Sequence, residues 1–160
     1  MTKVKFKTGQ IFAIPLKVDG FGCILVSHRH KRSLLCIGYV FDIYIDSLSN
    51  IDSQNDKLFI RSNVLQTIRF SALNIEQGIW PCIGEISLLD KEQWPMPFFW
   101  GRVGVNKAKL IQYADDDLYK VATEKIVDYP VSGYGLEELQ GAEYVELTLT
   151  KHFFPDFVST

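Results

Sequence analysis

Two apolar runs separated by a tight turn stand near the start of the chain and constrain its fold more than any other feature. Ile11 to Leu16 and Phe21 to Ser27 are apolar, and Val18-Asp19-Gly20 lies between them. An Asp-Gly pair between two strand-like runs is typical of a β-hairpin. We therefore expect the two runs to pair antiparallel and to begin a curved sheet or a small barrel.

Further strand patterns follow along the chain. In Leu34 to Ile45 the residues Phe41, Ile43 and Ile45 alternate with polar ones, as in a half-buried strand. Other segments show similar strand patterns: Leu65 to Ser71, Pro81 to Leu88, Phe98 to Val105 and Lys107 to Tyr113, with Tyr119 to Ile126 as a strand or a short helix.

Helical patterns are few. Ala72 to Gln77 favours one helical turn. Gly133 to Phe153 favours a helix, because its apolar residues recur at spacings of three and four. Those residues are Leu136, Leu139, Ala142, Val145, Leu149 and Phe153. The pattern predicts an α+β fold with a curved, mainly antiparallel sheet or small barrel, a few short helices and a helix late in the chain.

Length and composition limit the class of protein. The chain has 160 residues, of which 47% are hydrophobic, so it can bury a core and we expect a single domain over residues 1–160. Its basic N-terminus lacks the apolar segment of a signal peptide, and no apolar run is long enough to span a membrane. We expect a cytoplasmic protein.

Charge is distributed unevenly between the two halves. Residues 1–84 carry ten Lys and Arg against six Asp and Glu, whereas residues 85–160 carry seven against thirteen. This balance argues against a general nucleic-acid binder. The acidic second half suits either a cationic partner or an ordinary solvated surface.

Metal-binding and catalytic signals are weak. Cys23, Cys36 and Cys82 are scattered in apolar surroundings, which favours buried free thiols over a disulfide or a catalytic thiolate. The basic segment from His28 to Arg32 has too few ligands for a metal site and suits a solvated loop. Serines near the histidines lack a nucleophile elbow. We therefore expect no catalytic residue, no cofactor and no bound metal.

Two segments remain as candidate contact surfaces. Asp115, Asp116 and Asp117 form an acidic turn without the alternating ligands and glycine of a calcium loop, so the turn is either solvated or contacts a basic partner. The segment from Trp94 to Trp100 holds four large aromatic residues and two prolines. It is either a plug in the core or a partly exposed binding patch.

A resemblance to a known family rests on motifs spread over residues 9–153. They are GQIFAIPL from Gly9, DGFG from Asp19 and WPCIG from Trp80, with weaker support from Pro97-Phe98-Phe99 and from GAEYVE at Gly141. In their order and spacing these strings resemble the Immunity protein 26 family, small cytoplasmic bacterial proteins of polymorphic toxin systems. The matching residues Gly9, Pro15, Gly20, Trp80, Pro81 and Gly84 are expected to be structural. We expect the side chains of Trp80 and Ile83 to be buried.

The resemblance implies a function: binding and blocking a cognate bacterial toxin domain. It supplies no catalytic residues. We assign partner binding to the acidic turn of Asp115, Asp116 and Asp117 and to the aromatic residues Trp94 and Trp100. The alternative is a small-barrel adaptor that binds a peptide or RNA through an aromatic groove. An enzyme is the third and least favoured class.

Overall fold

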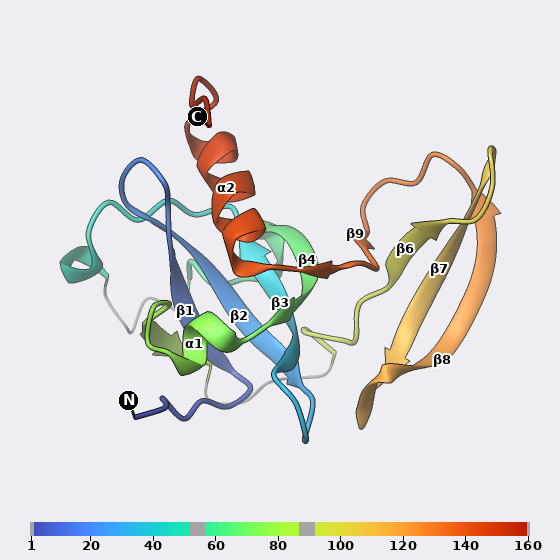
Figure 1. Ribbon diagram of the computed structural model, residues 1–160, viewed down its shortest axis with the longest axis horizontal. Coiled ribbons are helices and arrows are strands. Elements are labelled where there is room, and N and C mark those ends of the chain that lie inside the picture. Colours follow the sequence, from blue (N-terminus) through green and yellow to red (C-terminus); the bar gives the residue numbers. More distant parts are fainter. Residues whose placement is uncertain (1, 52–56, 87–91, 160) are drawn as a thin grey trace.

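The part of the chain that the structure describes forms two β-sheets and two α-helices (Figure 1). The computed structural model describes residues 2–51, 57–86 and 92–159. The first sheet has the strand order β10-β4-β3-β2-β1-β5 and the second sheet the order β8-β7-β6-β9. The first sheet comprises β1 (Gln10–Pro15), β2 (Phe21–Arg29), β3 (Leu35–Phe41), β4 (Val64–Ser71), β5 (Cys82–Glu85) and β10 (Leu139–Gln140). The second comprises β6 (Phe99–Arg102), β7 (Lys107–Ala114), β8 (Asp117–Asp128) and β9 (Gly135–Leu136). The helices are α1 (Leu73–Glu76) and α2 (Ala142–Phe153), and 3-10 turns span Leu48–Asn50 and Arg61–Asn63.

The predicted first hairpin is confirmed. β1 and β2 pair antiparallel, with Ile11 opposite Leu25 and Pro15 opposite Phe21. Gly20 has a φ of +73°, a conformation that side-chain-bearing residues rarely adopt, and its amide donates to Asp19 Oδ1 at 2.9 Å. The turn chemistry read from the sequence therefore fixes the register of the hairpin.

Both faces of the first sheet are covered, which explains why β2 and β3 are apolar almost without interruption. Alternate residues of β2 point to opposite faces. Ile24 and Val26 join a cluster with α1 and α2, whereas Cys23 and Leu25 pack on the other face against Trp94. The first residues of β3 add Leu35 and Ile37 to a third cluster, which is shared with the second sheet.

Trp80 closes the core beneath α2. Its side chain is 1% exposed and stacks on Phe70, as the prediction of a buried structural tryptophan requires. The indole Nε1 donates to Glu146 Oε2 at 3.0 Å, and Lys17 Nζ lies 3.4 Å from the other carboxylate oxygen. Ile83, predicted to be buried as well, is only partly buried.

The remaining residues of the family motif lie around the same strands. Gly9 has a φ of +93°, and a Cβ there would meet the Ile86 carbonyl oxygen at 2.8 Å, so both conformation and space require glycine. Pro15 ends β1, and the Pro81 carbonyl accepts the Ala13 amide at 2.8 Å. A Cβ on Gly84 would meet no atom within 4 Å, so packing does not explain that glycine.

Two predicted boundaries are wrong. The strand expected over Leu34 to Ile45 ends at Phe41, beyond which the Asp42 amide donates to the Asn63 carbonyl and Ile45 bridges to Phe21 instead. The late helix covers only Ala142–Phe153. Leu136 and Leu139 lie in β9 and β10, because the glycine-containing segment before the helix pairs in parallel with β6 and β4.

The other predicted elements are present with shifted ends. α1 confirms the helical turn in Ala72 to Gln77, and Tyr119 to Ile126 lies within a strand. Of the strand expected over Pro81 to Leu88, Cys82–Glu85 is a strand and residues 87–88 lie outside the described residues. The α+β class with a mainly antiparallel sheet is confirmed. Its form is two sheets rather than a closed small barrel.

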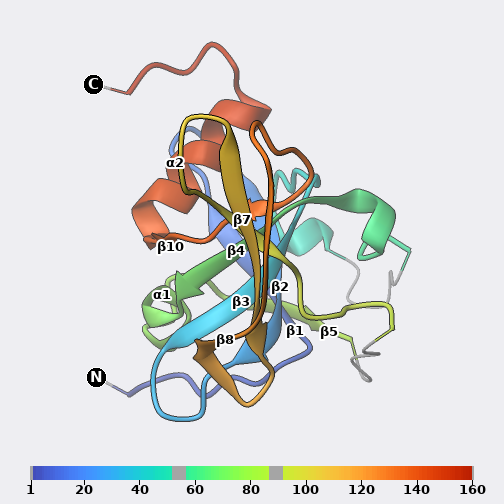
Figure 2. The same cartoon turned by 90° about the vertical axis from the view of Figure 1, so that its right-hand side faces the viewer.

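The second sheet stands beside β3 and β4, and its hairpin β7–β8 faces the viewer in Figure 2. Arg69 of β4 connects the two sheets. Its guanidinium donates to the carbonyls of Leu118 and Glu137, each at 3.2 Å, and lies over the Tyr113 ring at 4.3 Å. Among the described residues, neither helix has the length and apolar character needed to cross a membrane.

Candidate functional site

The aromatic segment divides between the core and the surface. Trp94 is 1% exposed and packs edge-on against Tyr39 and Phe41, with ring centroids 5.1 and 5.9 Å away. The Tyr39 hydroxyl donates to the Pro95 carbonyl and so holds the segment in place. Trp94 is therefore a core plug, and its ring offers no surface to a partner in this conformation.

Phe99 packs towards β3, so its neighbour Trp100 lies on the opposite face of the second sheet. It is partly exposed, and its ring centroid is 5.9 Å from that of Tyr129. Arg102, two residues further along β6, places its guanidinium 4.1 Å from the Tyr129 ring centroid. Arginine, tyrosine and tryptophan are the residues that dominate protein interfaces, so the assignment of Trp100 to partner binding remains a proposal that this environment suits.

The acidic turn meets the basic end of β2. Asp115 and Asp116 form the tight turn between β7 and β8. His28 Nε2 lies 3.4 Å from Asp115 Oδ1, and His30 Nε2 lies 3.3 Å from Asp117 Oδ1. We call these four residues the histidine–aspartate junction. It ties the tip of the second sheet to the first sheet, and it gives two of the three aspartates a contact within the fold.

Tyr119 reinforces this junction. Its ring packs edge-on against His30, with centroids 4.8 Å apart, and its hydroxyl lies 3.1 Å from Ser33 Oγ. Both histidine side chains are largely buried, at 13% and 14% exposure, whereas Asp115 is 59% exposed. The segment from His28 to Arg32, expected to be solvated, is thus partly covered by the hairpin, and Asp116 is the member of the acidic turn that faces solvent without a role in the junction.

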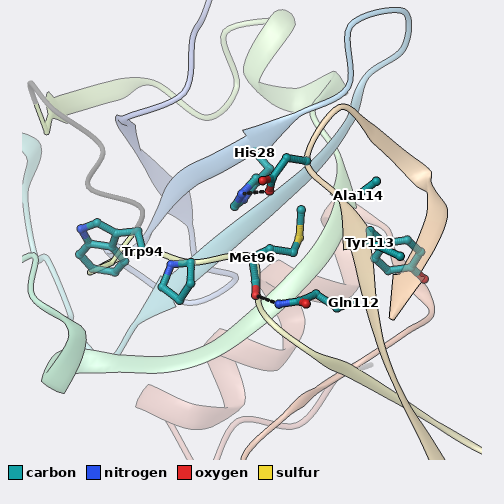
Figure 3. Close-up of a pocket in the computed structure, with 9 residues that line it drawn as sticks. His28, Trp94, Met96, Gln112, Tyr113 and Ala114 are labelled. Atoms are coloured by element: carbon teal, nitrogen blue, oxygen red, sulfur yellow. Dashed lines mark hydrogen bonds and ion pairs between the residues drawn. The ribbon is translucent and has the colours of Figure 1, made fainter. Parts of the chain in front are cut away.

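A pocket of about 360 Å³ lies between the junction and the Trp94 segment (Figure 3). His28, Asp115, Trp94 and Met96 are among the residues that line it. Gln112 closes it from β7 by donating its side-chain amide to the Met96 carbonyl at 2.7 Å. The lining mixes one histidine and one carboxylate with apolar groups, and His28 is its chemically distinctive member.

One group of side chains superficially resembles a catalytic triad: Ser27, His28 and Asp115. Ser27 Oγ lies 2.9 Å from His28 Nδ1, and His28 Nε2 faces Asp115. However, the Ser27 residue is 2% exposed, and its hydroxyl donates to the Ile37 carbonyl at 3.1 Å. A buried hydroxyl committed to the sheet cannot reach a substrate, so this group positions His28 and provides no nucleophile.

The three cysteines differ in environment. Cys23 and Cys36 are buried, and burial raises the pKa of each thiol to about 12. Cys82, also expected to be buried, is exposed on β5, so that expectation is wrong. Among the described residues, no group of three or more His, Cys, Asp or Glu side chains is arranged to hold a metal ion.

We expect one fast-reacting thiol in the native protein and three after unfolding. At pH 8 a thiol with a pKa near 12 is ionised to about one part in ten thousand, and the thiolate is the reactive form. Titration with a chromogenic disulfide reagent, with and without guanidinium chloride, measures this. The Cys82→Ser variant should have no fast thiol when native; rapid reaction of Cys23 or Cys36 would contradict the burial seen here.

The spacing of the histidines and aspartates along the sequence could have indicated the histidine–aspartate junction. His28 and His30 are spaced by two residues, and so are Asp115 and Asp117. In extended chain this spacing places both members of a pair on one face. A pair of histidines can therefore meet a pair of aspartates with the same spacing. The pairs are 87 residues apart in sequence, so no local pattern shows that they lie close together.

Together the fold and the junction define a two-sheet α+β protein with a broad exposed surface on its second sheet. The family model described as Immunity protein 26 matches residues 7–110, and the chain therefore belongs to this family. The matched span runs from before β1 into β7, so β8, β9, β10 and α2 lie beyond it. No curated protein and no solved structure matches the chain significantly.

Proposed function

We propose that this protein is a toxin-neutralising immunity protein that binds a cognate bacterial toxin domain tightly and blocks it in the cytoplasm. The observation that carries the proposal is membership of the Immunity protein 26 family. Binding rather than catalysis is the mode of action. What supports this is the environment of the candidate nucleophiles. Ser27, Cys23 and Cys36 are buried, and the exposed Cys82 donates its thiol to the Gly84 carbonyl at 3.4 Å.

The adaptor alternative has lost its main support. It required a small barrel with an aromatic groove, whereas the strands form two sheets and Trp94 fills the core. We therefore develop the immunity function alone.

The test is protection and binding. The probe is the toxin domain encoded beside the gene for this protein, purified with its active residue replaced. Co-expression of wild-type chain with the active toxin should restore growth, and the purified proteins should form a stable complex by calorimetry. A wild-type chain that neither protects against nor binds this toxin domain would overturn the proposed function.

Asp116 is expected to speed the encounter with a basic toxin surface. It is exposed at the tip of the β7–β8 turn, where a charge can steer association without holding the fold together. At low ionic strength, Asp116→Ser should slow association with the toxin domain by about two- to threefold. The association rate of this variant should also depend less on salt than that of the wild type. Stopped-flow kinetics at two salt concentrations measure this effect.

Asp156→Ser is the matched control, because it removes the same charge from another exposed aspartate outside both sheets. Asp115 and Asp117 are left intact, since their replacement would also disturb the junction. Equal association rates and salt slopes for the two variants would remove the acidic turn from the interface.

A further inference from the structure

β8 is an unusually exposed strand. It forms one edge of the second sheet, with β7 as its neighbour in the sheet order (Figures 1 and 2). Every residue from 119 to 126 is exposed, including apolar Val121 and Ile126 at 42% and 58%. A long exposed edge presents a row of main-chain donors and acceptors that can pair with another strand. β8 therefore offers both a hydrogen-bonding edge and apolar side chains.

The other edges of the two sheets offer far less. Among the described residues, β9 and β10 are edge strands of two residues each, and β5 has four residues. β8 has twelve residues and no proline between Asp117 and Asp128. A strand added to this protein would find its longest pairing site on β8.

The hydrogen-bonding direction along β8 follows from its register. The Tyr129 amide donates to the Asn106 carbonyl at 2.9 Å, and the pairing continues without interruption from Asp128 opposite Lys107 to Thr123 opposite Gln112. In an antiparallel pair, hydrogen-bonded and non-hydrogen-bonded positions alternate. The main-chain groups that bond to β7 are therefore those of Val127, Lys125 and Thr123. The main-chain groups that point outward are those of Asp128, Ile126 and Glu124.

We propose that the outward edge of β8 accepts an extended strand of the cognate toxin domain, which continues the second sheet. The inference rests on the proposed function and specifies its binding surface. Side chains of Glu124 and Lys125 lie on opposite faces of the sheet. The partner strand then carries a basic residue opposite Glu124 and an acidic residue beside it, opposite Lys125, because opposite charges across a strand pair stabilise it.

A second copy of this chain fits the edge poorly. Two identical strands paired antiparallel about a two-fold axis place one residue opposite its own copy. Centring the pair on Glu124 or on Lys125 sets like charges directly opposite each other, and centring it on Ile126 sets Glu124 opposite Asp128. Like charges at such positions destabilise pairing. Centring the pair on Thr123 or on Ala122 avoids like charges, but the pair then runs through the irregularity of β8 between Val121 and Thr123. Charge and this irregularity together disfavour self-association and leave the edge for a different strand.

Hydrogen exchange tests the proposal without any substitution. The amides of Glu124 and Ile126 should exchange rapidly in the free protein and become protected in the complex with the inactivated toxin domain. The amides of Thr123, Lys125 and Val127 should be protected in both states, because they already bond to β7. A complex that forms while the Glu124 and Ile126 amides stay unprotected overturns the proposal and leaves the proposed function standing.

A pair of variants at one position separates main-chain pairing from side-chain contact. Ile126→Pro removes an outward amide and spares the bonds to β7, a placement that edge strands tolerate. Ile126→Ala removes only the side chain. We expect the proline variant to bind the toxin domain about tenfold more weakly than the alanine variant, with a similar far-ultraviolet spectrum. Equal affinities of the two variants would contradict main-chain pairing.

Sedimentation of the free protein completes the test. We expect a monomer at micromolar concentration, because pairing two copies along the regular part of β8 sets like charges opposite each other. A dimer that the Ile126→Pro variant disperses would show that a second copy occupies the edge, and it would overturn the assignment to a toxin strand.

Discussion

Replacing Trp80 with alanine is expected to lower the free energy of unfolding by about 3–5 kcal/mol. The ring is 1% exposed and stacks on Phe70, so its removal leaves a cavity between the first sheet and α2. The substitution also removes the indole donor of Glu146, a residue that is only 9% exposed. Urea unfolding followed by circular dichroism measures the loss.

Two further variants separate the contributions at this site. Trp80→Phe keeps an apolar ring but loses the N–H donor and part of the ring volume, so it should cost about 1.5–3 kcal/mol. Leu139→Ala truncates a side chain that is 56% exposed and should change stability by less than about 0.5 kcal/mol. A Trp80→Ala protein as stable as the Leu139→Ala protein would show that Trp80 does not close the core.

Replacing Arg69 with methionine is expected to cost about 2–4 kcal/mol. Methionine keeps much of the apolar stem but loses the donors to the Leu118 and Glu137 carbonyls and the contact with the Tyr113 ring. Since these partners belong to the second sheet and its connections, amide protection should fall along β7 and β8 more than along β1 and β2. Native-state hydrogen exchange measures both the size and the location of the effect.

Arg102→Met is a closely matched control. Arg102 also donates to two carbonyls, those of Gly104 and Val105, and lies over a tyrosine ring, that of Tyr129. Its residue is exposed and its contacts stay within the second sheet and its turns, so its loss should cost less than about 1 kcal/mol. Similar losses for the two arginines would mean that Arg69 is not a connector between the sheets.

Much of the first sheet could be predicted because its signals are local. The turn at Asp19-Gly20 sets the first hairpin, and the apolar runs of β2 and β3 identify strands whose faces are both covered. Trp80 could be predicted to be buried because a large ring beside a proline and after a glycine turn suits the edge of a core. Local periodicity was sufficient for these elements.

The later part of the chain was harder to predict because its structure depends on distant partners. The segment before α2 has helical spacing of apolar residues, yet it becomes two short strands through parallel pairing with β4 and β6. The contacts of the turn aspartates within the fold could not be predicted, because their histidine partners lie far away in sequence. Exposure of the whole of β8 depends on where the second sheet stands, which no local pattern reveals.

The two parallel pairings near the end of the chain have a consequence for the speed of folding. The β1–β2 and β2–β3 pairs form across short connections, whereas β9 returns to β6 and Leu139 of β10 pairs with Arg69 of β4. Closing such long loops costs conformational entropy before any contact compensates it, and contacts between distant segments slow folding. α2 directly follows β10, so the cover over Trp80 depends on this closure. We therefore expect the refolding rate to respond more to changes in β10 and α2 than to changes in the first hairpin.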